Sequence, residues 1–292
     1  MRIELPDIRH NQFGFEALVF LKSQTEELWL ETIDIDMKLT TWFDADMCAA
    51  FGAILYRLGE RLNTVKLNNI SENVEIILSK NGFLSHYGRN RFADTWGTTI
   101  TYQRFDVKDD RYFAGYIEKE LIHRSEIPKM SAGLLKKFRE SIFEIFSNAV
   151  LHSQTKYGVF SCGQFYPRGS RLNFSVADLG IGIRGNVKEI KGFDFPAEDA
   201  IDWATREHNT TKRGNIPGGL GLKLLCEFVD HNGGNIQILS DAGYWRRENR
   251  NVTKKRINDV FPGTVVNIEI NTADTHSYQL ACENRITEND IF

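Results

Sequence analysis

The sequence predicts an α/β protein, because helical and strand-like patterns alternate along the chain. Apolar residues recur every three or four positions over 134–152, which is the spacing of an amphipathic helix. Over 171–177 they occupy every second position, as in a strand with one buried face. The first hundred residues contain short strand-like runs separated by helical ones, which is typical of a small α/β layer.

Composition narrows the classes of protein to consider. The chain has 292 residues, a length that corresponds to about two domains. A hydrophobic content of 41% and a charged content of 26% are ordinary for a soluble globular protein. The net charge of −3 argues against a dominant polyanion-binding surface, so there is no strong sign of a nucleic-acid partner. Local basic patches remain compatible with that charge.

The sequence also bears on compartment and metal content. No run approaches the ~20 apolar residues that span a bilayer, and the first residues lack the apolar core of a signal peptide. We therefore expect a cytoplasmic protein without a membrane partner. Four scattered cysteines form no C-x-x-C pair, which predicts reduced thiols and no zinc site.

The elements expected along the chain fall into two groups, with a boundary at residue 105. In the first group, 1–105, we expect strands at 16–21, 28–35, 65–67 and 98–105, and helices at 46–62 and 71–78. In the second group, 106–292, we expect helices at 109–121, 134–152, 196–206 and 219–229, and strands at 157–164, 171–177, 235–239 and 264–270.

The helix at 134–152 has a second, polar stripe. Lys137, Ser141, Glu144, Asn148 and His152 follow one another at intervals of about one turn. Such a row is usually the solvated side of a helix. Two later motifs make it more informative: D-L-G-I-G ends the strand-like run at residue 178, and G-G-L-G-L opens a helix at residue 218.

Together these motifs, E-x-x-x-N-A, D-x-G-x-G and G-G-L-G-L, resemble the N, G1 and G2 boxes of the GHKL family. A strand beginning at Gly263-Thr264 completes the pattern. The family has the Bergerat fold and includes gyrase, mismatch-repair ATPases, ninety-kilodalton heat-shock chaperones and sensor histidine kinases. The resemblance implies a two-layer ATP-binding domain over 106–292, with a mixed, mostly antiparallel sheet under helices.

The resemblance implies ATP and Mg²⁺ as ligands. Asn148 matches the family's magnesium ligand, and its amide oxygen is a hard donor suited to that ion. Glu144 matches the residue that polarises the attacking water in the hydrolysing branch, although many kinases of the fold also have an acid there. The residues expected at the nucleotide are Asp178, Gly180, Gly182, Thr210, Thr211, Lys212, Gly218, Gly219, Leu220, Gly221, Leu222 and Thr264.

The residue types at these positions suit the recognition of adenine and the binding of phosphate. A carboxylate at a strand end, such as Asp178, can accept a hydrogen bond from the exocyclic amine of adenine, and Thr264 matches the Thr that holds a helping water. Glycines at a helix start expose N–H groups, and the helix dipole there favours phosphate. Thr210, Thr211 and Lys212 resemble part of a lid over the phosphates. The chain has no P-loop motif.

The N-terminal 105 residues resemble a STAS-like domain, the fold of anti-sigma-factor antagonists. The likeness lies in the helix after 42–44, the VKL strand at 65–67 and the helix that ends with NGFL at 81–84. In that family a phosphorylatable hydroxyl follows the Asp before the helix, whereas 44–48 here contains none. We expect a module that docks a protein partner or forms a homodimer.

Three functions remain open at this point. The first is a slow Mg²⁺-dependent ATPase whose nucleotide-gated lid switches a protein–protein interaction. The second is an anti-sigma-type Ser/Thr protein kinase that acts on a partner protein. The third is a non-catalytic ATP sensor. Incubation with γ-labelled ATP separates them by released phosphate, labelled protein or neither.

Overall fold

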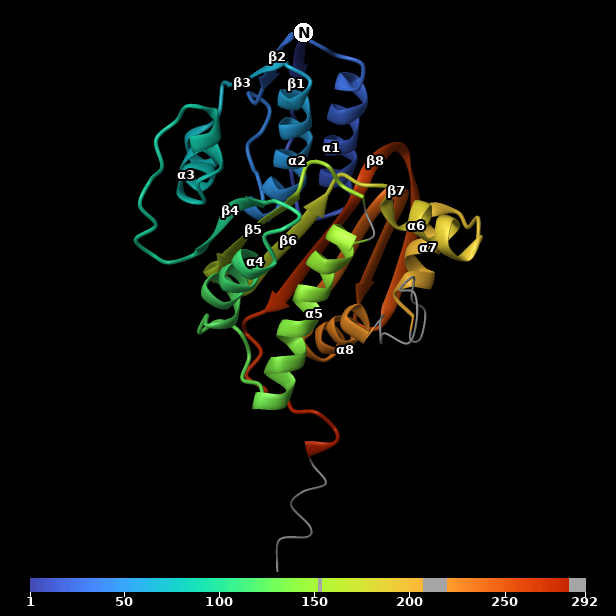
Figure 1. Cartoon of the computed structure of the whole chain (residues 1–292). Helices are drawn as coiled ribbons and strands as arrows, with labels where there is room; N and C mark the ends of the chain where they lie inside the picture. Colours follow the sequence, from blue (N-terminus) through green and yellow to red (C-terminus); the bar gives the residue numbers. More distant parts are fainter. Residues whose placement is uncertain (152–153, 207–219, 284–292) are drawn as a thin grey trace, which may run out of the picture.

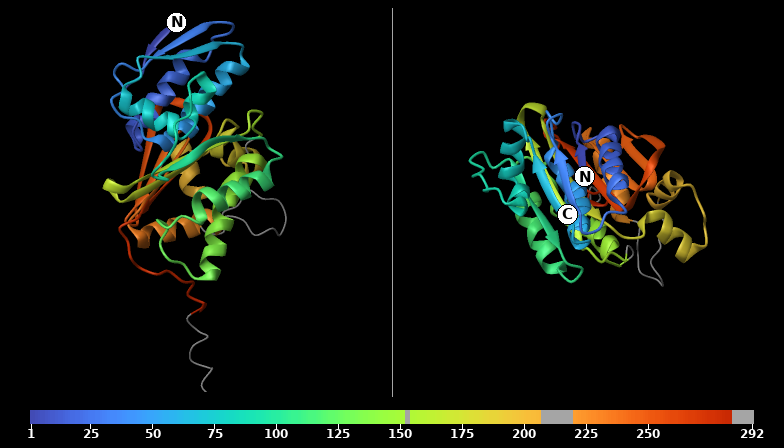
Figure 2. Two further views of the ribbon diagram at one scale, coloured as in Figure 1. Left: turned by 90° about the vertical axis from the view of Figure 1, so that its left-hand side faces the viewer. Right: turned by 90° about the horizontal axis from the view of Figure 1, so that it is seen from above.

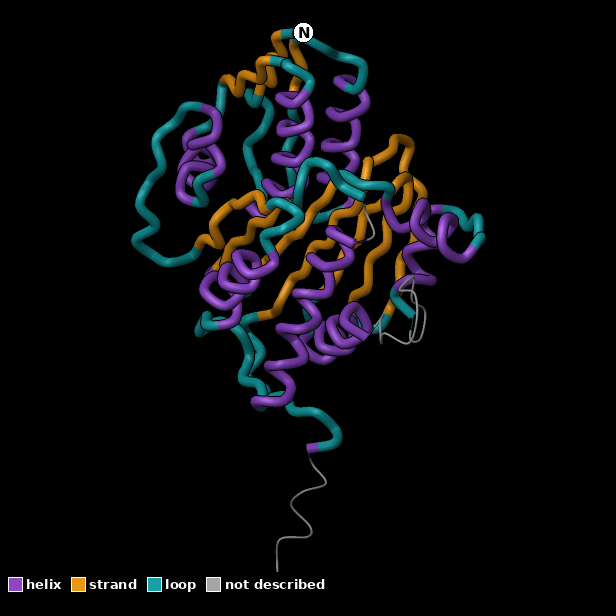
Figure 3. Tube along the Cα trace, viewed as in Figure 1, coloured by secondary structure: helices purple, strands orange, loops and turns teal. Residues whose placement is uncertain are grey.

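The computed structural model describes residues 1–151, 154–206 and 220–283. Strands form one sheet of three and one sheet of five, and helices lie between and beside them (Figure 1). The predicted α/β class is therefore confirmed. Figure 3 shows the larger sheet between two sets of helices. No helix in the described part of the chain is long and apolar enough to cross a membrane.

The N-terminal part is built on a parallel sheet with the order β1-β2-β3. Ile3 pairs with Ile35, and Ile35 with Leu67, so their apolar side chains line one face. The elements are β1 (Arg2–Glu4), α1 (Gln12–Thr25), β2 (Thr32–Asp36), α2 (Cys48–Glu60), β3 (Thr64–Asn68) and α3 (Glu72–Lys80).

The strand predicted at 16–21 is wrong, because these residues lie within helix α1. Asn11 caps this helix by accepting a hydrogen bond from the backbone N–H of Gly14 at 3.1 Å. Phe15, Leu18 and Val19 are buried on one side, at helical spacing. A short apolar run fits a strand or a buried helix equally well, and the tertiary packing decided between them.

The larger sheet has the order β4-β5-β6-β8-β7, and all its neighbouring strands are antiparallel. Its strands are β4 (Thr99–Phe105), β5 (Val159–Tyr166), β6 (Arg171–Asp178), β7 (Asn235–Glu248) and β8 (Asn251–Asn271). β4, expected with the N-terminal part, pairs with β5 instead. A division into two domains at residue 105 stays a prediction, but the strand just before it belongs to the larger sheet.

Five helices and a short helical turn lie between or after the larger sheet's strands in the described part of the chain. Helix α5 contains the polar stripe identified in the sequence, and helix α6 was not predicted. The helices are α4 (Asp110–Ile117), α5 (Ala132–Leu151), α6 (Gly182–Lys191), α7 (Ala197–Ala204) and α8 (Leu220–Asn232), with a π-helical turn at Glu118–Ile122 after α4. The rings of Phe138 in α5 and Phe228 in α8 lie 5.2 Å apart, edge to face.

The larger sheet is covered on both faces (Figure 2). Leu172, Phe174 and Val176 of β6 pack in the same apolar cluster as α5 and α8. The alternate residues of the strand point to the other face, where α1 and α2 lie. On that face Asn173 and Ser175 are buried polar side chains. The N-terminal part thus meets a face of the sheet that is partly polar.

The β7–β8 hairpin is longer than the rest of the sheet. β6 pairs with β8 only over 264–271, whereas β7 and β8 continue to pair from Gly243↔Arg256 to Glu248↔Asn251. We call residues 241–261 the hairpin arm. The sequence predicts strands at 235–239 and 264–270, with a β-strand and turn segment between them, and the structure joins all of these into one long hairpin.

Candidate functional site

Residues expected at the nucleotide come together where β6 ends and β8 enters the larger sheet. We call this strand-end region the sheet edge. β6 ends at Asp178, and in the ladder this residue lies opposite Thr264 in β8 and Val159 in β5. Directly opposite residues of antiparallel strands have Cβ atoms about 5 Å apart. The structure therefore places Asp178 and Thr264 side by side, although they are far apart in the sequence.

The carboxylate of Asp178 is buried, with 3% of the residue exposed. One of its oxygens accepts a hydrogen bond from the backbone N–H of Gly180 at 2.8 Å. This contact forms a tight turn directly after the strand and fixes the side chain at the sheet edge.

Two glycines allow the backbone to pack closely beside Asp178. Gly182 has a φ of 71° and Gly263 a φ of 117°, values that favour glycine. A Cβ on Gly263 would lie 2.2 Å from the carbonyl oxygen of Asp178. A side chain at 263 is therefore sterically excluded, and the edge depends on glycine there.

Ser240 is a member of this edge that sequence reasoning missed. Its hydroxyl donates to the carbonyl oxygen of Gly263 at 2.8 Å and accepts from the N–H of Ile183 at 2.8 Å. It also lies 3.0 Å from the hydroxyl of Thr264. Ser240 thus connects β7, β8 and the start of α6. A serine one residue beyond a predicted strand gives no distinctive signal.

The C-terminal end of α5 lies at the same edge (Figure 1). The helix ends at Leu151, and the chain enters β5 at Val159, which pairs with Asp178. Glu144 and Asn148 lie in the last two turns of α5 and are half-buried. Topology therefore brings the polar stripe of α5 towards the strand ends. Within the described ranges no cluster of three or more His, Cys, Asp and Glu side chains can hold a metal.

The segment that the sequence predicts to bind phosphate is described only in part. Helix α8 begins at Leu220 and includes Gly221, and half-buried Leu222 packs against the core below the sheet. The predicted helix start is therefore placed correctly. Five expected residues, and His152, lie outside the described residues: Thr210, Thr211, Lys212, Gly218 and Gly219.

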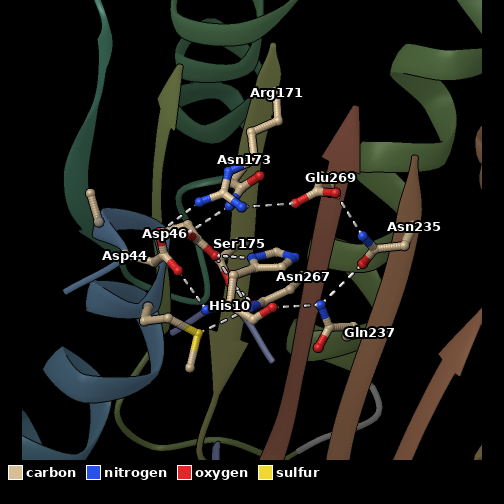
Figure 4. Close-up of polar contacts among 12 residues, drawn as sticks. His10, Asp44, Asp46, Arg171, Asn173, Ser175, Asn235, Gln237, Asn267 and Glu269 are labelled. Atoms are coloured by element: carbon tan, nitrogen blue, oxygen red, sulfur yellow. Dashed lines mark hydrogen bonds and ion pairs between the residues drawn. The ribbon is translucent and has the colours of Figure 1, made fainter. Parts of the chain in front are cut away.

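A second polar cluster lies between the N-terminal helices and the sheet (Figure 4). Nδ1 of His10 lies 2.6 Å from a carboxylate oxygen of Asp46, and both side chains are almost completely buried. Asp46 also accepts hydrogen bonds from the amides of Asn173 at 3.5 Å and Asn267 at 3.3 Å. The backbone N–H of His10 donates to Asp44 at 2.7 Å.

The charges around His10 come from several elements. Burial lowers the pKa of His10, but the carboxylates of Asp46, Glu269 and Asp44 raise it by more, so the pKa lies above its usual value. The guanidinium of Arg171 pairs with Asp44 at 3.3 Å on the same side. The hydrogen bonds of Asp46 connect the N-terminal part to the sheet. The side chains of His10 and Asp46 are too deeply buried to contact a substrate.

Part of the chain is similar to a known protein. No protein-family model matches the chain. The circadian input-output histidine kinase CikA of Synechococcus elongatus is 32% identical over 108 residues. The aligned segment makes up 37% of this chain and 13% of that kinase. The similarity indicates a kinase-like relationship for the aligned part of the chain.

Proposed function

We propose that the sheet edge at Asp178 and Thr264 binds ATP with Mg²⁺, in a domain of the GHKL type. The main support is the pairing of Asp178 with Thr264, next to glycines at 182 and 263 that let the backbone approach closely. The partial similarity to a histidine kinase points in the same direction.

Each residue has a distinct role in this proposal. Asp178 accepts a hydrogen bond from the adenine amine, and Thr264 holds a water beside it. The amide oxygen of Asn148 would hold Mg²⁺, which would supply positive charge to neutralise the phosphates. Glu144 orients the water that attacks the γ-phosphate. The N–H groups at the start of α8 bind phosphate.

The proposed reaction is slow hydrolysis of ATP in the cytoplasm, coupled to a lid that includes Thr210, Thr211 and Lys212. The N-terminal part, proposed as STAS-like, docks a protein partner, and the buried contacts of Asp46 connect it to strands β6 and β8. In this proposal, a shift of β6 and β8 on nucleotide binding is transmitted to the N-terminal part through these hydrogen bonds.

A second candidate is a protein kinase that phosphorylates Ser or Thr of a partner. The similarity to a kinase supports phosphoryl transfer, and an acidic residue at 144 suits either reaction. In that case the lid and Mg²⁺ site serve the same purposes, but the acceptor is a hydroxyl of another chain instead of water.

One experiment tests binding and turnover together. The purified chain is incubated with γ-labelled ATP and Mg²⁺, alone and with a cell extract that supplies partner proteins, and nucleotide binding is measured separately by calorimetry. Released phosphate supports the ATPase, and labelled partner protein supports the kinase. Binding without either product identifies a sensor, and absence of binding contradicts the proposal as a whole.

A further inference from the structure

The hairpin arm has an unusual concentration of positive charge. Between residues 246 and 256 it contains six basic residues and one acidic residue, a formal charge of +5 in a chain whose net charge is −3. The basic residues are Arg246, Arg247, Arg250, Lys254, Lys255 and Arg256. The segment is therefore basic in sequence, and Asp199, Asp202 and Asp230 of neighbouring helices lie against part of it.

Half of these side chains have carboxylate partners within the arm or in nearby helices. Arg247 pairs with Asp230 at 2.7 Å, Lys254 with Asp199 at 2.8 Å, and Arg246 with Glu248 at 2.8 Å. For Arg250, Lys255 and Arg256, no carboxylate of the described residues lies within ion-pair distance. These three cations are available to an outside partner.

The tip of the arm is exposed, and α1 and α7 pack on its two faces at Tyr244 and Trp245. All residues from 249 to 256 are exposed, and successive residues of a strand point to opposite sides. Lys255 lies opposite Tyr244, whose ring packs 6.1 Å from Phe15 of α1. Lys254 lies opposite Trp245, whose indole donates to Asp202 of α7 at 3.2 Å. The arm therefore has basic side chains on its α1 side and on its α7 side.

The hairpin turn places a cationic side chain at the tip of the arm. Asn249 and Arg250 both have positive φ, 49° and 64°, as the two central residues of a tight hairpin turn require. Glycine is the least strained residue at the second position, and a long cationic side chain occupies it here. Arg250 is thus held at the outermost point of the ribbon.

We propose that the hairpin arm binds double-stranded DNA through its phosphates, without reading sequence. The major groove of B-form DNA admits a two-stranded β-ribbon, and its two walls would meet cations on both faces of the arm. A membrane surface or a flat acidic protein would engage one face only. The deep, narrow major groove of A-form RNA does not admit such a ribbon.

The test uses the full chain and a fluorescein-labelled duplex of about 20 base pairs, with binding followed by anisotropy over a range of salt concentrations. We expect binding that weakens steeply with salt. The triple substitution Arg250→Ala, Lys255→Ala and Arg256→Ala should lower affinity at low salt by roughly tenfold or more. It should also reduce the slope of log K against log salt by up to about three, one for each lost phosphate contact.

A matched control removes the same charge from other exposed positions, by Lys66→Ala, Lys108→Ala and Lys136→Ala. This variant should retain the wild-type affinity, and circular dichroism should show both variants folded. The proposal is overturned if the wild-type chain leaves the duplex unbound, or if both variants lose affinity equally. It is also overturned if polyglutamate displaces the labelled duplex as effectively as unlabelled duplex does.

Discussion

Strands β6 and β8 contain two polar regions that are built differently. Under the N-terminal helices, Asn173 and Asn267 are hydrogen-bonded to Asp46, which also pairs with His10. At the sheet edge, Asp178 and Thr264 are positioned by a turn and by close backbone packing at Gly263. The first region joins elements distant in sequence through side chains, and the second is shaped by the backbone. Buried polar residues of the same two strands thus hold the N-terminal part in one region and, in our proposal, bind nucleotide in the other.

The largest effect we expect is on turnover at the edge. If Glu144 orients the attacking water, Glu144→Ala should keep ATP binding and lose about 10²–10⁴-fold in hydrolysis, because the interaction arises mainly in the transition state. Phosphate release and calorimetry measure the two quantities. The matched control is Glu140→Ala, one turn earlier and exposed beside Lys137. Hydrolysis at the wild-type rate in the Glu144 variant would make this carboxylate structural.

The next effect should appear in the buried cluster and not at the edge. Asp46→Ala removes the carboxylate partner of buried His10, and breaking such a pair typically costs about 3–5 kcal/mol. Urea denaturation should show this loss of unfolding free energy. Asp106→Ala, which breaks the exposed pair with Arg104, should cost at most about 1 kcal/mol. If the two losses are equal, the cluster does not hold the N-terminal part to the sheet.

Asp178→Asn should produce a smaller effect, on binding alone. Losing the charged acceptor for the adenine amine should cost about 1.5–3 kcal/mol, or roughly tenfold to a hundredfold in ATP affinity. Calorimetry measures the affinity, and circular dichroism checks the fold. Asp194→Asn is the control, because this exposed aspartate pairs with Arg184 and Lys188 instead. Unchanged affinity in the Asp178 variant would remove this residue from the site.

The smallest effect is a pH dependence confined to the buried cluster. Because folding raises the pKa of His10, its charged form stabilises the protein fully below the unfolded pKa of about 6.5. That contribution is lost as pH rises through the higher pKa of the folded state. The wild-type chain should therefore lose stability relative to His10→Gln over this range, by at most about 1.4 kcal/mol per pH unit. Parallel stability curves for the two proteins would contradict this assignment.

Much of the larger sheet could be predicted from local pattern. The alternation in β6 and the helical stripe of α5 each reflect one apolar face, so their positions follow from periodicity alone. The run at 16–21 could not be assigned in this way, because a short apolar segment has no clear period. The role of Ser240 and the pairing of the hairpin arm could not be predicted, because their contacts depend on strands that are distant in sequence.

The sequence by itself determined the α/β class, the main elements and the motifs that suggest a nucleotide site, because periodicity and glycine placement are local properties. Only the tertiary structure decided that β4 joins the larger sheet and that α1 and α2 cover its polar face. It also decided that Asp178 and Thr264 are neighbours. Strand order and the packing of one layer on another depend on contacts between distant residues, and no local pattern specifies them.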